Sequence, residues 1–208
     1  MVRSRASSRA AGTKYETDVS RYLSACTNKM IIRMPKTGKL DKGDIFGLTF
    51  QSDPIAVECK SPGQEQSYKV PKWIRETQAE TVNSLSVAGI LLIKRFRKRV
   101  EESMCILTEE YAQILGFDIQ NTPIVKVRGY DDWWENIDNL HTVRIKIRGE
   151  EDAYYIVTTL KNIVGIFDIH KEEIDIQLTQ EEKQHLDTHS EIKIHPQYPG
   201  MPIIHITI

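Results

Sequence analysis

Two carboxylates and one lysine, spaced for neighbouring strands, are the residues of this sequence best suited to chemistry. Asp44 opens one apolar run, and Glu58 and Lys60 close the next. The segment 51–54 between the runs is rich in turn-forming residues, so we expect a β-hairpin. In such a hairpin Asp44 and Glu58 lie on paired strands. Glu58 and Lys60 share one face, because side chains two apart on a strand point the same way.

This combination is typical of a metal site that hydrolyses phosphodiester bonds. Carboxylate oxygens suit Mg²⁺ or Mn²⁺ better than Zn²⁺. Such a metal polarises the scissile phosphate and lowers the pKa of a bound water. Lys60 would offset the repulsion between Asp44 and Glu58 and stabilise charge in the transition state. Glu16, on the first predicted helix, is a further acid for the same site.

The charge of the chain divides sharply along its length. Residues 1–100 hold 19 Lys and Arg against 9 Asp and Glu, a net of +10, which leaves 9 against 20, a net of −11, for 101–208. A basic half that carries the carboxylates fits a polyanionic substrate such as DNA. The acidic half fits a solubilising extension, a protein-binding surface or a shield against non-specific DNA binding.

Composition excludes two classes of protein. No apolar stretch approaches the roughly 20 residues that a membrane-spanning helix needs, so we expect no membrane partner. The three cysteines, Cys26, Cys59 and Cys105, are isolated and odd in number, which favours a reducing compartment without disulfides. The basic start of the chain is no secretory signal. We therefore expect a cytoplasmic or nucleoid-associated protein.

The spacing of apolar residues predicts an α/β (α+β) fold with a mixed sheet flanked by helices. Residues 1–12 read as a flexible basic arm, and Thr13 as the cap of a first helix. Within a core of 13–116, a helix, three strands, a helix and a strand follow in that order, then a further β-α piece. The second helix starts at Pro71 and is expected to bury Trp73, Ile74, Thr77, Val82 and Leu85.

Residues 117–208 are expected to form an acidic, β-rich extension or second domain. Strand-like runs occupy 123–128, 142–148, 172–178, 191–195 and 203–208. The segment 154–167 fits a helix and a long strand equally well. Trp133 and Trp134 fit a core position or an interface anchor. His185 and His189 have the spacing of a helical metal pair, but surface histidines are favoured because no companion ligand is near.

The order of the acidic residues resembles that of the PD-(D/E)XK nuclease superfamily, and within it the archaeal-type Holliday junction resolvases, which phages also carry. Four segments, spread over residues 9–107, carry the resemblance: Gly12–Glu16, Gly43–Asp44, Glu58–Lys60 and Arg75–Glu80. The resemblance implies a restriction-endonuclease-like core. It also implies Glu16, Asp44 and Glu58 as metal-site acids, Lys60 as the catalytic lysine and Gln78 as a supporting polar residue.

Two sets of cations are candidates for DNA contacts. Lys36, Lys39 and Lys42 precede Asp44 on a glycine-bearing loop. Arg95, Arg97, Lys98 and Arg99 follow an apolar strand, where a charged strand end that protects a sheet edge is the alternative.

The sequence thus predicts a Mg²⁺-dependent DNA endonuclease that acts on branched DNA as a homodimer, since a four-way junction presents two symmetric strands. The resemblance implies products with a 5′-phosphate and a 3′-hydroxyl, and a phage origin fits it as well. A restriction-type, nicking or homing endonuclease of the same fold is one alternative, with 117–208 reading sequence. A non-catalytic nucleic-acid-binding protein with a nuclease-like core is the other.

Overall fold

The computed structural model describes residues 4–34, 42–62, 69–127, 130–148, 150–167, 192–194 and 202–204. The chain forms two compact units, 1–168 and 169–208. In the second unit β9 (Ile192–Ile194) pairs with β10 (Pro202–Ile204) in antiparallel fashion. β9 lies within the predicted run 191–195, and β10 overlaps the start of the run 203–208. The predicted run at 172–178, and His185 and His189, lie outside the described residues.

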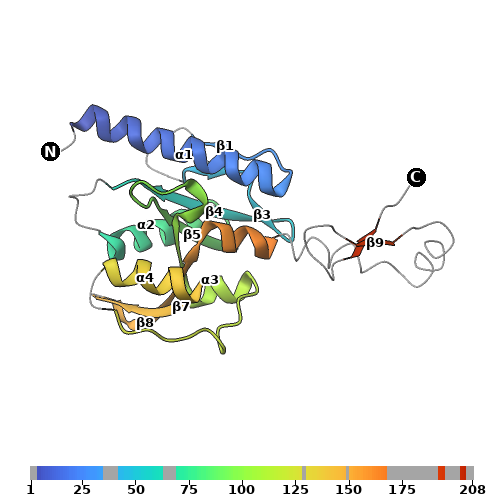
Figure 1. Cartoon of the computed structure of the whole chain (residues 1–208). Helices are drawn as coiled ribbons and strands as arrows, with labels where there is room; N and C mark the ends of the chain where they lie inside the picture. The colour runs from blue at the N-terminus through green and yellow to red at the C-terminus, as the bar shows by residue number, and fades with distance from the viewer. Residues whose placement is uncertain are drawn as a thin grey trace. The chain divides into compact units, whose positions relative to one another are not determined.

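The first unit is built on a mixed sheet of eight strands (Figure 1). The sheet order is β1 (Ile32–Arg33), β2 (Ile45–Phe46), β4 (Asp53–Lys60), β5 (Ala88–Ile93), β6 (Met104–Thr108), β8 (Glu150–Thr159) and β7 (Val143–Ile147), with β3 (Thr49–Phe50) paired to β4. Only β4 and β5 run parallel among these pairs. The predicted mixed α/β sheet is thus confirmed.

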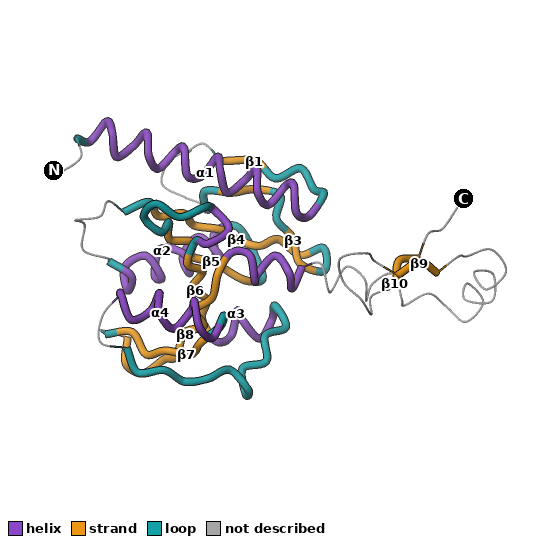
Figure 2. Tube along the Cα trace, in the orientation of Figure 1, coloured by secondary structure: helices purple, strands orange, loops and turns teal. Residues whose placement is uncertain are grey.

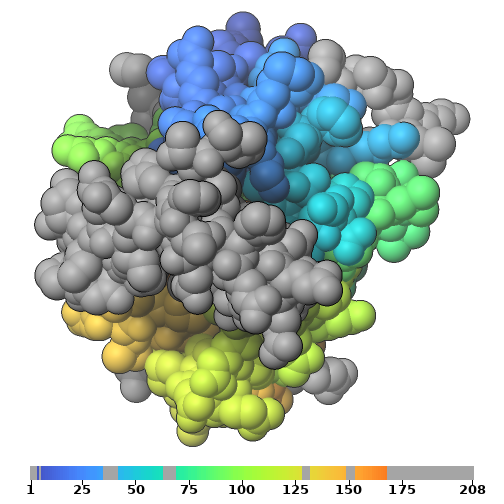
Figure 3. Space-filling model, turned by 90° about the vertical axis from the view of Figure 1, so that its right-hand side faces the viewer, coloured from blue at the N-terminus to red at the C-terminus, as the bar shows by residue number. Residues whose placement is uncertain are grey.

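Helices cover both faces of this sheet. They are α1 (Arg5–Thr27), α2 (Val70–Asn83), α3 (Glu109–Ile114), α4 (Tyr130–Leu140) and an unlabelled helix at 160–167, with a short 3₁₀ turn, η1 (Val100–Glu102). Figures 1 and 2 show α1 on one side of the strands and α2 and α4 on the other. On the face drawn in Figure 3, the surface of α1 (blue) continues into that of the strands up to β4 (cyan).

Two hydrophobic clusters fill the spaces between the layers. The first joins Tyr15, Val19 and Leu23 of α1 to the helix at 160–167 across one sheet face. The second joins Val70 and Ile74 of α2 to Trp133 and Ile137 of α4 across the other. Every residue of β5 is buried, which explains its continuous apolar sequence. Trp133 is therefore a core residue.

The predicted hairpin is confirmed as β3 and β4. Gln51 and Ser52 form its two-residue turn with φ of 48° and 75°. Positive φ at both turn positions matches the twist of the flanking strands. Asp53 and Pro54, expected in the turn, are the first residues of β4 instead, paired with Phe50 and Thr49.

The first helix begins earlier than predicted. Residues 5–12, expected to belong to a flexible arm, lie in α1, and Thr13 is inside the helix rather than at its cap. The N-cap is Ser4, whose hydroxyl accepts a hydrogen bond from the N–H of Ser7 at 3.2 Å. Alanine and arginine, which are frequent in this segment, favour helix strongly enough to extend it to that cap.

Two predictions about the second helix and the strand after it are wrong in part. Val82 and Leu85 are 72% and 85% exposed, and Glu80 and Thr81 are buried instead. Val82 lies within α2 on the side away from the buried residues Ile74, Thr77 and Thr81. Leu85 follows the end of α2 at Ser84 and has a positive φ. Beyond Ile93 the basic residues do not extend β5 but form a turn that leads to η1.

The boundary expected near residue 117 does not separate two units. β7 and β8 lie beyond this residue, yet β8 pairs with β6 along the whole length of β6. The pairing runs from Met104 opposite Thr159 to Thr108 opposite Tyr155. The first unit therefore continues to residue 168. Of the predicted strand at 123–128, the described residues 123–127 form only an isolated bridge, between Ile124 and Arg144. The ambiguous segment 154–167 holds both structures, a strand to Thr159 and then a helix.

Gly89 tests how tightly α2 packs on β5. A Cβ atom at Gly89 would meet Thr81 Oγ1 at 2.1 Å and Thr77 Cγ2 at 3.1 Å. We expect Gly89→Ala to lower the free energy of unfolding by about 1–3 kcal/mol through overpacking. Gly165→Ala is the control, since nothing lies within 4 Å of its Cβ position in the helix at 160–167. It should raise stability by about 0.5–1 kcal/mol. Urea denaturation of both variants decides, and equal effects would contradict the packing.

Candidate active site

Asp44 lies immediately before β2 and comes close to Glu58 of the paired strand β4. Ile45 lies opposite Val57, and the N–H of Asp44 donates to the Val57 carbonyl at 2.8 Å, so Asp44 comes beside Glu58. The Asp44 Oδ2 atom accepts a hydrogen bond from the N–H of Cys59 at 2.9 Å. Both carboxylates are buried, with 3% and 2% of their residue surface exposed.

Gly43 makes this approach of the two strands feasible. Its φ is +94°, and a Cβ atom there would lie 3.1 Å from the Val57 carbonyl oxygen. Glycine adopts this conformation without the strain that a side chain would bring. The Gly43–Asp44 pair in the sequence is therefore a structural unit in which the glycine lets the aspartate reach β4.

Lys60 completes the group on the same strand as Glu58. Its Nζ atom forms a short ion pair with Glu58 Oε1, and it donates to Glu76 Oε2 of α2 at 2.7 Å. Lys72, one turn earlier on α2, pairs with the other oxygen of Glu76 at 3.3 Å. Lys60 is thus held between an acid on its own strand and an acid on the helix that covers this face.

Burial dominates the electrostatics of Glu58. Desolvation, and then repulsion from Asp44, raise the pKa of Glu58 to about 9, and the opposing attraction of Lys60 does not cancel them. Glu80, buried on α2, raises the pKa of Glu58 further. Burial would lower the pKa of Lys60, but its interactions with Glu58 and Glu76 outweigh that cost and raise it. The group therefore holds more negative charge than its single lysine offsets.

One carboxylate oxygen of this group has no partner. Within the described ranges, Glu58 Oε2 is buried and accepts no hydrogen bond. An unpaired buried carboxylate oxygen beside a second carboxylate is costly. This oxygen is a ligand of the kind that a hard cation would bind. Among the described residues, however, no group of three His, Cys, Asp or Glu side chains is arranged to hold a metal.

Glu16 forms its ion pair with a residue outside this group. Its carboxylate pairs with Arg33 of β1 at 3.2 Å. Burial, and then the charges of Asp44, Glu58 and Glu16, raise the pKa of the Cys59 thiol, which places all three acids within electrostatic reach of one residue. Cys59 packs in the cluster under α1, whereas Lys60 contacts α2. Glu16 therefore approaches from the opposite face of the sheet.

Glu76, which the sequence did not single out, takes the place expected for Gln78. Gln78 lines a small space between α2, β5 and α3, together with Thr77 and Tyr111. No hydrogen bond joins it to Lys60 or to the acids in the described part of the chain. The register of the predicted helix determines which of its residues face the strand. Glu76 occupies one of these positions, so the sequence contained the signal for it.

The cations predicted to contact DNA differ in their exposure and contacts. Lys36 and Lys39 lie outside the described residues, and Lys42 is exposed beside Gly43. Arg95 is 9% exposed, and its guanidinium binds both oxygens of Asp138 on α4, at 2.7 and 2.9 Å. It also stacks on Trp134 at 4.3 Å, so Arg95 fastens α4 to the core.

The remaining three cations, Arg97, Lys98 and Arg99, are exposed on the turn after β5. Lys98 pairs with Glu102 at 3.2 Å, and Arg99 lies 3.6 Å from Glu101. These contacts are at the surface, where ion pairs contribute little to stability. The three side chains therefore remain accessible to a polyanion.

Comparisons of the chain with family models, with curated proteins and with solved structures found no match. In the part of the chain that the structure describes, no helix is both long and apolar enough to cross a bilayer.

The raised pKa of Glu58 predicts how stability depends on pH. Between its ordinary pKa of 4.5 and about 9, the folded chain keeps a proton that the unfolded chain has released. Without added metal, stability from this group is therefore present below pH 4.5 and is lost as pH rises towards 9, by at most about 1.4 kcal/mol per unit. Urea denaturation in EDTA at several pH values measures this slope.

Glu58→Gln should flatten the loss of stability with pH, because glutamine does not titrate. Glu135→Gln, on the exposed side of α4, is the matched control and should keep the wild-type slope. Equal slopes for Glu58→Gln and the wild type would show that the Glu58 carboxyl is not the buried titrating group.

Proposed function

We propose that this protein is a metal-dependent DNA endonuclease that acts on branched DNA. The observation that carries the proposal is the buried pair of carboxylates, Asp44 just before β2 and Glu58 on the paired strand β4, with Lys60 beside Glu58. The unpartnered Oε2 of Glu58 supports it, since a divalent cation would supply the missing partner. Mg²⁺ or Mn²⁺ fits these oxygen donors.

Asp44 and Glu58 would hold the cation. Glu16, implied as a third acid by the resemblance, is paired with Arg33 and, in the described part of the chain, is not arranged with them as a ligand. When bound, the cation polarises a phosphate and lowers the pKa of a water. Cation binding would replace the proton that Glu58 retains and hold Glu58 ionised. The hydrogen bond from Cys59 N–H fixes the Asp44 carboxylate, so its position does not depend on the ligand.

Lys60 would act on the substrate rather than on the cation. Its pKa lies above the ordinary value, so it carries a positive charge throughout the physiological range. Held by Glu58 and Glu76, the ammonium group is oriented to stabilise negative charge that develops on a phosphate. Glu76 is then a positioning residue, since it acts through Lys60.

The arrangement of the core supports the same proposal. The chain runs from α1 through four strands, β1 to β4, to α2 and then to β5, which returns parallel to β4. Apart from the split of one predicted strand into β2 and β3, this is the element order predicted for residues 13–116, which resembles that of restriction-endonuclease-like nucleases. In sheets of this kind, ligand sites lie beyond the carboxyl ends of parallel strands, which is where Lys60 ends β4.

A homodimer with two-fold symmetry would present two such sites to the two equivalent strands of a four-way junction. Mg²⁺-dependent cleavage should therefore be compared on a four-way junction, a flap and a linear duplex of one sequence. We expect the junction to be cut fastest. Equal cleavage of the duplex would favour a restriction-type, nicking or homing enzyme, and binding without cleavage would favour a non-catalytic DNA-binding protein.

Asp44→Asn and Lys60→Ala test the residues in the proposed site. Each should lower the cleavage rate at least about 100-fold, because each removes a charge that stabilises the transition state. The exposed carboxylate variant Glu135→Gln is the control and should cleave like the wild type. If a folded Asp44→Asn or Lys60→Ala protein cleaves at the wild-type rate, the site is wrong.

Glu76→Gln and Gln78→Ala separate the contact seen in the structure from the residue implied by the resemblance. Glu76→Gln removes the charge that orients Lys60, so we expect a slower cleavage rate at saturating substrate and a lower apparent pKa of Lys60 in the pH profile. Gln78→Ala should change neither quantity by more than about 2-fold. The reverse ranking would assign the supporting role to Gln78.

A further inference from the structure

We infer that a basic groove along α1 and the loop 94–101 binds the phosphate backbone of the nucleic acid. The inference rests on the proposed function, since it names the surface that holds the same substrate. Two hollows form this groove. One, of about 610 Å³, follows α1, and the other, of about 460 Å³, lies between α1 and the loop. They share Asp18 and Arg21, so they adjoin.

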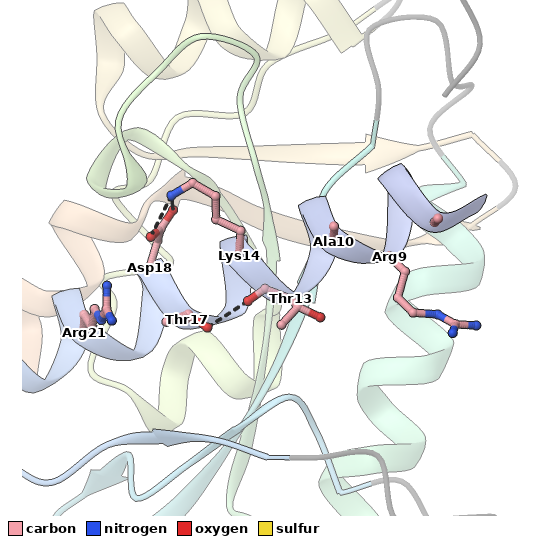
Figure 4. Close-up of a pocket in the computed structure, with 8 residues that line it drawn as sticks. Arg9, Ala10, Thr13, Lys14, Thr17, Asp18 and Arg21 are labelled. Atoms are coloured by element: carbon pink, nitrogen blue, oxygen red, sulfur yellow. Dashed lines mark hydrogen bonds and ion pairs between the residues drawn. The ribbon is translucent and has the colours of Figure 1, made fainter. Parts of the chain in front are cut away.

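Cations outnumber acids along the groove. Its lining holds six cations, Arg9, Lys14, Arg21, Lys94, Lys98 and Arg99, and two acids, Asp18 and Glu101. Figure 4 shows Arg9, Lys14 and Arg21 along α1, with the ion pair between Lys14 and Asp18. A surplus of this sign attracts a polyanion.

Three of the cations are available without breaking an ion pair. No carboxylate of the described residues pairs with Arg9, Arg21 or Lys94. Lys94 instead lies over the ring of Tyr15, 5.7 Å from its centroid, at the floor of the second hollow. Arginine side chains present a planar set of donors that matches phosphate oxygens. Phosphate groups are therefore the ligand chemistry that the groove fits.

The length of the groove indicates a polymer rather than a single anion. From Ala6 to Arg21 the helix rises about 22 Å. Successive phosphates of one duplex strand rise about 3.4 Å each, so the groove spans several of them. A lone phosphate ion would occupy only a small part of this surface.

The groove starts next to the candidate active site. The N–H of Lys94 donates to the carbonyl of Lys60 at 2.9 Å, across the carboxyl ends of the parallel strands β4 and β5. Arg95, the next residue, is tied to Asp138 and is not part of the groove. The Lys60 side chain contacts α2 and the Lys94 side chain lies over Tyr15 of α1, so a backbone at the site would reach the groove by passing around the carboxyl ends of β4 and β5.

The test is DNA binding in EDTA, where metal-dependent cleavage cannot occur. Fluorescence anisotropy with a labelled four-way junction gives the affinity as a function of salt. Arg21→Ala/Lys94→Ala should lower the affinity about 10-fold or more at ~100 mM salt and reduce the slope of log K against log salt by about 2. Lys126→Ala/Lys161→Ala removes two exposed lysines outside the groove and should match the wild type.

A second variant guards against a packing effect of Lys94 on Tyr15. Arg9→Ala/Arg21→Ala changes two exposed side chains of α1 and should give the same loss of slope. If folded groove variants keep the wild-type slope, the groove is not the binding surface, whereas Mg²⁺-dependent cleavage would leave the proposed function standing. Loss of slope in a protein that cuts no DNA would support the groove and overturn the proposed function. A wild-type protein that binds no DNA would overturn both.

Discussion

The pairing of β2 with β4 brings two buried carboxylates together, Asp44 just before β2 and Glu58 on β4. Burying like charges is unfavourable unless protons, cations or hydrogen bonds compensate. Here the compensation is divided: the N–H of Cys59 donates to Asp44, and Lys60 pairs with one oxygen of Glu58. Burial and the charge of Asp44 still raise the pKa of the Glu58 carboxyl. Among the described residues, Glu58 Oε2 still has no partner, so added positive charge would be favourable at this position.

The layers around the sheet are arranged so that this position stays fixed. α2 brings Glu76 to Lys60 while Ile74 anchors the same helix in the second hydrophobic cluster. Further along the sheet, Arg95 ties α4 to the end of β5 through Asp138. This contact and the pairing of β8 with β6 make a large part of the acidic half an integral layer of the core.

The structure places several cations of residues 1–100 in one region of the surface. These cations differ in their contacts. Arg95 is buried against α4 and pairs with Asp138, whereas Arg21 and Lys94 line a common hollow. The backbone of Lys94 is hydrogen-bonded to that of Lys60. The acids of the second half are likewise partly structural, since Asp138 pairs with Arg95. Net charge therefore predicted a polyanionic partner, and the positions of the ion pairs decide which cations remain accessible.

Local sequence determined the hairpin at 51–52, the buried strand β5, the cap of α3 at Thr108 and the meeting of Asp44, Glu58 and Lys60, because each follows from turn chemistry, capping or strand alternation. Tertiary structure decided what depends on distant segments: the extension of the sheet by β7 and β8, the role of Arg95 and the choice of Glu76 over Gln78 as the partner of Lys60. Long-range pairing and side-chain burial set these, and neither leaves a periodic signal in the sequence.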